Sequence, residues 1–327
     1  MFKFILKRLL MMIPVFLGVS FVIFTLMYFT PGDPAQLLLG DDASEQSIHM
    51  LRQELGLDEP FLTQYAKYVK GIVFEGNLGT SYTTQRPVTE EILLRFPNTM
   101  LLAVLSVTVS VVIGITAGII AATKQYSIFD NLATGISLAG VSMPNFWQGL
   151  MSIILFSIIL KWLPASGFSG PKYWILPAMT IGTSSAAKIM RMTRSSMLEV
   201  IRQDYIRTAR AKGQIERVVI LKHALKNALI PVITVVGISF GALLGGAVLT
   251  ESIFAIPGIG KLMVDSIAMR NFPMVQGGVL FIAVVFSFVN LGVDILYAFV
   301  DPRIKSQYVS NKKNKKRRKV ELAYGEK

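Results

Sequence analysis

The side chains that most often perform catalysis are scarce in this sequence and poorly spaced for it. The 327 residues include no cysteine and two histidines, His49 and His223, without an H-E-x-x-H pair or two carboxylates in one apolar run. Metal-assisted and acid–base catalysis need such groupings. Segment 258–261, GIGK, is similar to part of a phosphate-binding loop, but Ala255 and Leu262 occupy the positions of its first glycine and its hydroxyl residue. We therefore expect no cofactor bound by this chain, and an intramembrane enzyme is only an alternative.

Charge, in contrast, is strongly patterned. Lys and Arg total 33 against 20 Asp and Glu, a net charge of +13, while 52% of the residues are hydrophobic and the mean hydropathy is +0.54. The charges gather in a few stretches between long apolar runs, which is typical of repeated membrane crossings. Segment 188–227 alone holds ten Lys or Arg and three Asp or Glu. We attribute the positive charge to membrane topology and expect no nucleic-acid partner.

The apolar runs set the fold class. Five of them, 9–29, 98–122, 132–160, 229–249 and 277–300, are long enough to cross a bilayer. A sixth segment, 175–187, has only 13 uncharged residues, mostly small. If it crosses, segment 188–227 and both termini lie inside, where 24 bases then face 7 acids, as the positive-inside rule requires. The sequence therefore predicts an all-α integral membrane protein with six transmembrane helices, the weak one shielded from lipid by the others.

The same pattern divides the chain into regions. Residues 1–30 form a retained anchor, because their apolar run exceeds a signal-peptide core and no small-x-small cleavage site follows; a cleaved signal peptide is the alternative. Residues 31–95, with ten acids and five bases, form a polar outer region after the first helix. Residues 96–302 form the membrane core. Residues 303–327 form a basic cytoplasmic tail that contacts anionic membrane lipid.

Two sets of glycines recur every four residues and so share a helix face. They are Gly114 with Gly118, and Gly237 with Gly241 and Gly245. Small-residue faces let helices approach closely within a membrane, so we predict that both sets are packing surfaces.

Polar and aromatic side chains inside the apolar runs could line a transport route. The candidates are Asn145, Trp147, Ser184 and Ser185, with interhelical contact as an equal alternative. Asp294 is the one acid inside an apparent crossing and lies near its inner end. We expect Asp294 to make a structural polar contact, not to relay protons.

Within the basic segment, residues 204–213 are predicted to be helical. Met197, Ile201, Tyr205 and Ala209 repeat every four residues as one face, and Gly213 ends the helix. A second helical piece, about 215–227, returns the chain to the membrane. A helix–glycine–helix that projects from a membrane bundle is a rigid contact surface.

This segment resembles the coupling loop of ABC-importer permeases. The run YIRTARAKG at 205–213, followed by HALKNALIP at 223–231, has the form found in the dipeptide/oligopeptide/nickel subgroup. The general signature has Glu-Ala where this chain has Arg207 and Thr208, and its later Leu-Pro falls five residues before Ile230-Pro231. Further matches to the subgroup are FPNT at 96–99, SMPNF at 142–146, IFAIPGIG at 253–260 and DPR at 301–303.

The resemblance implies a type I ABC-importer permease fold and a multi-protein system. The partners would be a second homologous permease, two cytoplasmic ATPases that hold ATP and Mg²⁺, and an outer substrate-binding protein. Peptides are the expected cargo, with nickel or another small solute as the alternative. The residues implied to couple to an ATPase are Tyr205, Arg207, Thr208, Ala209, Arg210, Ala211, Lys212 and Gly213.

A secondary transporter is the rival transport class. It should show inverted repeats or paired broken helices at the membrane midplane. The principal break in this sequence, at 143–145, has no counterpart elsewhere in the chain. A topogenic charged loop without a docking role is the plainer alternative for segment 188–227.

Overall fold

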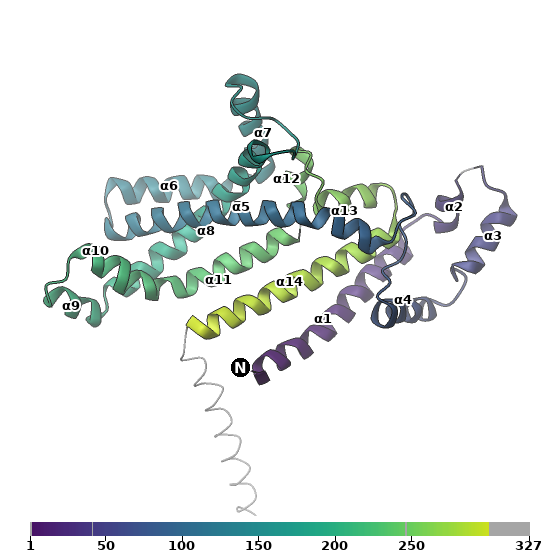
Figure 1. Cartoon of the computed structure of the whole chain (residues 1–327), viewed down its shortest axis with the longest axis horizontal. Helices are drawn as coiled ribbons and strands as arrows, with labels where there is room; N and C mark the ends of the chain where they lie inside the picture. The colour runs from purple at the N-terminus through teal and green to yellow at the C-terminus, as the bar shows by residue number, and fades with distance from the viewer. Residues whose placement is uncertain (1, 41, 246, 301–327) are drawn as a thin grey trace, which may run out of the picture.

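The computed structural model describes residues 2–40, 42–245 and 247–300, and this part of the chain is helical without a β-strand (Figure 1). One isolated bridge pairs Thr80 with Pro87. The predicted basic tail and the DPR motif lie outside the described residues. The helices are α1 (Phe2–Phe29), α2 (Pro34–Leu39), α3 (Glu45–Glu54), α4 (Phe61–Glu75), α5 (Val88–Thr123), α6 (Ile128–Ser142), α7 (Asn145–Ser152), α8 (Pro171–Ile201), α9 (Asp204–Ala211), α10 (Glu216–Val218), α11 (Leu225–Leu244), α12 (Val248–Ile253), α13 (Ile259–Ala268) and α14 (Phe272–Val300), with π-helical segments η1 (Ile153–Ile159) and η2 (Val219–Ala224).

Long apolar helices confirm the all-α membrane class. Within the described residues, four helical stretches are long and apolar enough to cross a membrane: part of α1, all of α5, the continuous stretch Glu216–Leu244, and most of α14. A fifth arises if α6 and the α7–η1 stretch count as one broken span. The predicted crossing at 175–187 lies inside α8, which is 31 residues long and therefore reaches about 46 Å at ~1.5 Å per residue. Length thus permits the sixth crossing, although its hydropathy does not qualify it.

Helix α8 is poor in large apolar residues, and most of its predicted crossing is buried against other helices. It runs along α5 and also contacts α6 and α11. A Cβ on Gly182 of α8 would lie 2.6 Å from the Val109 side chain of α5, so the two backbones approach too closely for any side chain there. Ala178, Ala186 and Ala187 are buried on the same helix. Small residues allow this close packing, while Ile175 and Met179 of α8 are exposed.

The third predicted crossing, 132–160, is not one helix. Helices α6 and α7 meet at a bend of 102°, at the Met143–Pro144 step. Pro144 has no backbone N–H to continue the helix, and it holds Met143 in an extended conformation with φ −82° and ψ 126°. Beyond this bend α7 contacts α8 and α12, and the chain that follows α7 projects from the bundle in Figure 1.

Helices α1 and α14 lie side by side at one edge of the bundle (Figure 1). Arg8 of α1 and Asp294 of α14 form an ion pair across this contact, with Nη1 and Oδ2 2.9 Å apart. Asp294 therefore makes the interhelical polar contact expected of it.

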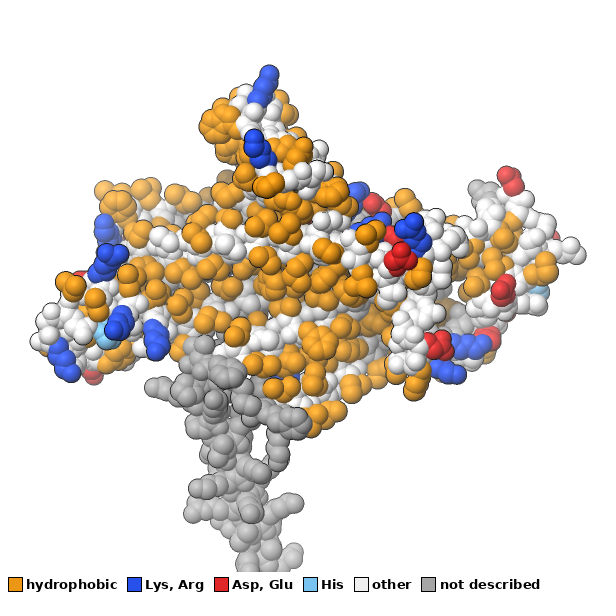
Figure 2. Space-filling model, in the orientation of Figure 1, with side chains coloured by type: hydrophobic (Ala, Val, Ile, Leu, Met, Phe, Trp, Pro, Cys, Tyr) orange, Lys and Arg blue, Asp and Glu red, His pale blue; other side chains and the backbone are white. Residues whose placement is uncertain are grey.

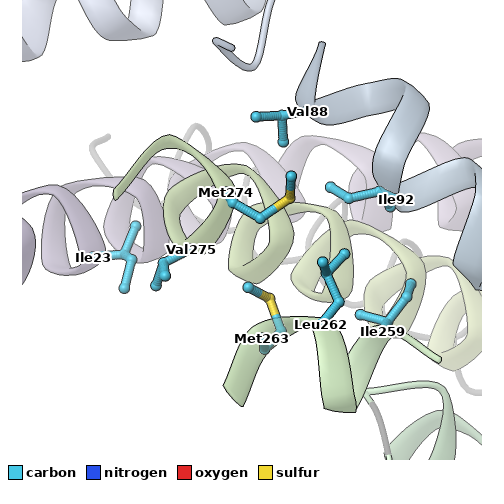
Figure 3. Close-up of a cluster of buried hydrophobic side chains, with 8 residues drawn as sticks. All are labelled: Ile23, Val88, Ile92, Ile259, Leu262, Met263, Met274 and Val275. Atoms are coloured by element: carbon cyan, nitrogen blue, oxygen red, sulfur yellow. The ribbon is translucent and has the colours of Figure 1, made fainter. Parts of the chain in front are cut away.

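A cluster of buried side chains ties the chain together at the end of the bundle where α5 and α14 begin (Figure 3). Helices α1, α5, α13 and α14 all contribute to it. Its members are Ile23, Val88, Ile92, Ile259, Leu262, Met263, Met274 and Val275.

Candidate functional site

The first candidate site is α9, the short helix in the basic segment. Helix α8 ends at Ile201, and Gln203 is extended at φ −74° and ψ 149°, so α9 starts a new helix. The predicted face that runs on from Met197 to Tyr205 is therefore wrong. Tyr205 is 44% exposed, and Ile206, which is 0% exposed, takes the inward position. The break changes the helical phase, which a four-residue repeat assumes to be constant.

A cluster of buried apolar side chains packs α9 against the rest of the protein, and we call it the apolar seat of α9. Ile206 and Ala209 point into it from α9, and Ala122 at the end of α5 joins it. The others come from the end of α8 and from the stretch leading into α11: Met197, Val219, Ile220, Ala224 and Ala228. Ala209 therefore belongs to the seat and does not lie on the outer surface of α9.

Polar contacts fix the orientation of α9. The Arg210 guanidinium donates to Glu216, with Nε–Oε2 at 3.0 Å and Nη2–Oε1 at 2.6 Å, and this hydrogen bonding raises the pKa of Arg210 above its ordinary value. Asn227 Nδ2 donates to the Tyr205 hydroxyl at 2.8 Å. His223 Nε2 lies 2.7 Å from Gln214 Oε1. These contacts join α9 and its following turn to η2 and α11.

The opposite face of α9 is open and basic. The Arg207 side chain is 77% exposed and lies 3.9 Å from Asp204, too far for a hydrogen bond. Thr208, Ala211 and Lys212 are also exposed. Basic side chains gather at this end of the molecule in Figure 2, over the region of α9 and α10. A partner could therefore contact α9 without disturbing its apolar seat.

Gly213 ends the turn that follows α9, as predicted. Its φ of +76° lies in the left-handed region, which glycine adopts without a Cβ penalty. The eight predicted coupling residues thus lie on one helix and its terminal turn, although Ala209 faces inward and the others outward. Their role in coupling stays a prediction.

The glycine faces lie at helix contacts. A Cβ on Gly114 or Gly118 of α5 would come within 2.8 Å of Ile189 and 2.6 Å of Thr193 on α8, respectively. Gly237 and Gly241 of α11, and Gly245 directly after its last residue, lie against α14. The nearest α14 side chains are Val293 to Gly237, Phe286 to Gly241 and Ile282 to Gly245.

The predicted pathway residues are less clearly grouped. Asn145 and Trp147 are exposed at the start of α7, whereas Ser184 and Ser185 are half-buried on α8. A weak contact between these helices involves a neighbour that the sequence did not single out: Thr183 Oγ1 lies 3.4 Å from Gln148 Oε1. A pathway role for the four residues stays a prediction.

A buried carboxylate on α12 was missed from the sequence. Glu251 is 0% exposed and accepts hydrogen bonds from Thr99 Oγ1 at 2.8 Å and from the backbone N–H of Lys261 at 3.0 Å. Burial raises the pKa of Glu251, because desolvation disfavours the charged form. Thr99 in turn accepts from the Ile259 backbone N–H at 2.8 Å. Glu251 thus ties α12 and α13 to α5.

Gly258 is the sequence signal that could have pointed to Glu251. A Cβ at Gly258 would overlap the Glu251 carboxyl group, so the glycine in the IFAIPGIG motif makes room for it.

Among the described residues, no group of three or more His, Asp or Glu side chains is placed to hold a metal ion.

Comparison with known proteins covers nearly the whole chain. Residues 114–306 match the family described as "Binding-protein-dependent transport system inner membrane component", and residues 1–103 match its N-terminal companion. The dipeptide transport system permease protein DppB of Alkalihalophilus pseudofirmus is 46% identical over 93% of this chain and 100% of its own length. The glutathione transport system permease protein GsiC of Escherichia coli is 43% identical over 93% and 99%.

A solved structure supports the fold. The inward-facing MetNI methionine ABC transporter contains a chain that is 20% identical, with a TM-score of 0.54 over 65% of this chain and 97% of that one. At this identity the likeness concerns the fold alone. It agrees with the type I permease fold that the motifs imply.

Proposed function

Because the chain belongs to the family of inner membrane components of binding-protein-dependent transport systems, we propose that it forms part of a membrane pathway for short peptides. It is a permease subunit of an ABC importer. Two relatives that it matches over nearly their whole length are named for dipeptide and glutathione transport, and glutathione is itself a short peptide. That shared cargo chemistry carries the proposal, with nickel or another small solute as the alternative.

The same membership and the open face of α9 support the partners in this proposal. A second homologous permease completes the pathway, two cytoplasmic ATPases bind and hydrolyse ATP with Mg²⁺, and an outer protein delivers the substrate. Segment 188–227 and both termini then face the cytoplasm, and region 31–95 faces outward, as the distribution of charge favours. This chain binds no nucleotide in the proposal.

Coupling is mechanical in this scheme. An ATPase binds the exposed face of α9 through contacts with Arg207, Ala211 and Lys212. When the two ATPases close together on bound ATP, they move that helix. The apolar seat and the Arg210–Glu216 pair make α9 one body with the stretch that continues into α11. Movement of α9 therefore tilts membrane helices and alternates access to the pathway.

The test is energised uptake in proteoliposomes that contain both permeases, the ATPases and the binding protein. Uptake of a labelled dipeptide should require ATP in the vesicle lumen, on the cytoplasmic face of the permeases. It should continue when ionophores collapse the ion gradients. Uptake that continues without ATP and stops with the ionophore would identify a secondary transporter instead. A complex that hydrolyses ATP but takes up no peptide would contradict the cargo.

A further inference from the structure

A cavity with charged side chains on its walls and apolar side chains beneath them lies at the opposite end of α5 from α9. It has a volume of about 340 Å³ and lies between the first turns of α5, helix α13 and the turn around the Thr80–Pro87 bridge. We call it the α13 pocket. Its polar lining includes Ser81, Glu91, Arg95, Lys261, Asp265 and Asn271. Figure 2 shows acidic and basic side chains together over this part of the molecule.

Two ion pairs bring charges of both signs to this pocket from different walls. On α5, Arg95 pairs with Glu91 one turn earlier, and on α13 Lys261 Nζ lies 3.1 Å from Asp265 Oδ2. The Glu91 side chain is only 5% exposed. The Lys261 and Asp265 side chains are 38% and 46% exposed, so a ligand can reach both charges of that pair. A ligand with a carboxylate at one end and an ammonium group at the other therefore finds partners for both.

The walls of the α13 pocket are held in place. Asn271 Nδ2 donates to Ser81 Oγ at 2.8 Å and Thr83 Oγ1 at 3.1 Å, and Asn271 Oδ1 accepts from the Tyr82 backbone N–H at 3.0 Å. The Glu251 network fixes α13 against α5 from behind. A site fixed before binding loses little conformational freedom when a ligand arrives.

The floor of the pocket is apolar. Leu262 and Met274 line it, and both belong to the cluster in Figure 3, beside Ile92. An apolar floor with a few placed charged groups is the usual composition of a small-molecule site. A volume of 340 Å³ lies near the lower limit of such sites, about 300–1,000 Å³, and suits a ligand of two or three residues.

We propose that the α13 pocket is a transit site for zwitterionic short peptides on the outer side of the permease. The peptide carboxylate lies toward Lys261 and Arg95, and its ammonium group lies toward Asp265 and Glu91. This inference rests on the proposed function and adds to it a site and a requirement for free peptide termini.

The test is direct binding to the solubilised complex of permeases and ATPases without the binding protein. Saturation-transfer difference NMR with dialanine as the probe should detect binding to the wild type. Lys261→Gln should weaken it about tenfold, because one charged partner of the carboxylate is lost. Dialanine amide, which lacks the carboxylate, should bind the wild type weakly and should be insensitive to Lys261→Gln.

Lys67→Gln is the matched control. Lys67 is an exposed lysine of region 31–95 that pairs with Glu59 and does not line the α13 pocket. It should leave dialanine binding unchanged. Equal affinity of Lys261→Gln and wild type, equal binding of dialanine and its amide, or no binding by the wild type would each overturn the site. ATP-driven uptake by the wild-type system tests the proposed function separately.

Discussion

Ala209 and Ala211, two positions apart on α9, have opposite environments. Ala209 is 9% exposed within the apolar seat, whereas Ala211 is exposed on the basic face. Ala209→Glu would bury an unpaired carboxylate and should destabilise the permease by about 3–5 kcal/mol. Ala211→Glu should leave stability unchanged and should lower substrate-stimulated ATPase activity, because it adds an acid to the proposed docking face. Thermal unfolding in detergent and ATPase assays of the assembled complex measure the two effects.

The comparison of these two variants separates seating from docking. If Ala211→Glu retained full stimulated ATPase activity and uptake at wild-type abundance, α9 would not be the docking surface. If Ala209→Glu unfolded at the wild-type temperature, the apolar seat would be wrong. The two changes introduce the same side chain on the same helix, so a general effect of charge predicts equal outcomes.

The raised pKa of Glu251 predicts a pH-dependent stability. Below about pH 4.5, the ordinary pKa of a glutamate, the carboxyl is protonated in both the folded and the unfolded state, so the free energy of unfolding does not change with pH through this group. As pH rises, the unfolded state loses the proton first, so the folded state loses relative stability until its own higher pKa is passed. Melting temperatures of wild type and Glu251→Gln, measured from pH 4.5 upward, should therefore diverge in slope, with the wild type falling faster. Parallel curves would contradict a buried carboxylate with a raised pKa.

The sequence predicted the conformation of a single residue where that conformation depends on neighbours in the chain. Gly213 was predicted to end a helix, and its positive φ is a property of that residue and its neighbours. Glu251 was missed because its burial depends on Thr99, which lies 152 positions away in the chain. Tyr205 was placed on the wrong face because the break at Gln203 resets the helical phase.

At the level of elements, hydropathy located the long apolar spans but did not predict the bend between α6 and α7. The Met143–Pro144 step was visible as a break, yet the 102° angle depends on how α7 contacts α8 and α12. Helix α8 shows the opposite case. Its predicted crossing is short in apolar residues, and most of those residues are buried against other helices. The crossing stays a prediction that loop charge supports and hydropathy does not.

The α11–α14 contact predicts a substitution that can be compensated. A Cβ at Gly237 would overlap Val293, so Gly237→Ala should destabilise the fold by about 1–3 kcal/mol through overpacking. Val293→Ala in the same chain should restore most of that loss, because it removes the overlapping methyl groups. Unfolding of the purified permease in detergent measures both.

Gly292 of α14 provides the control for this contact. A Cβ there would meet nothing within 4 Å, so Gly292→Ala should be neutral or slightly stabilising, as glycine is unfavourable inside a helix. Loss of stability in Gly237→Ala that Val293→Ala does not relieve would show that the two helices are not in contact at this point.

For the whole molecule, α5 connects the two ends at which partners are proposed. Glu91 in its first turns lines the α13 pocket, and Ala122 near its end lies in the seat of α9, about 47 Å further along the helix at ~1.5 Å per residue. Helix α8 runs along α5, and α6 joins α8 through a bidentate Asp130–Arg194 pair with distances of 2.6 and 2.8 Å. These contacts favour movement of α5, α6 and α8 as one rigid body.

A disulfide between α6 and α8 tests this rigid body. The chain has no cysteine, so an introduced pair is unambiguous. A Cβ at Gly140 would lie 3.9 Å from the Cβ of Ala187, which is within the range that disulfides adopt. Gly140→Cys with Ala187→Cys should cross-link on oxidation, seen as loss of thiol labelling. ATP-driven peptide uptake should then stay within about twofold of the reduced protein, because the bond joins helices that do not move relative to each other. Each single variant controls for the substitution itself. Uptake that stops on oxidation and returns on reduction would show instead that α6 slides against α8 in each transport cycle.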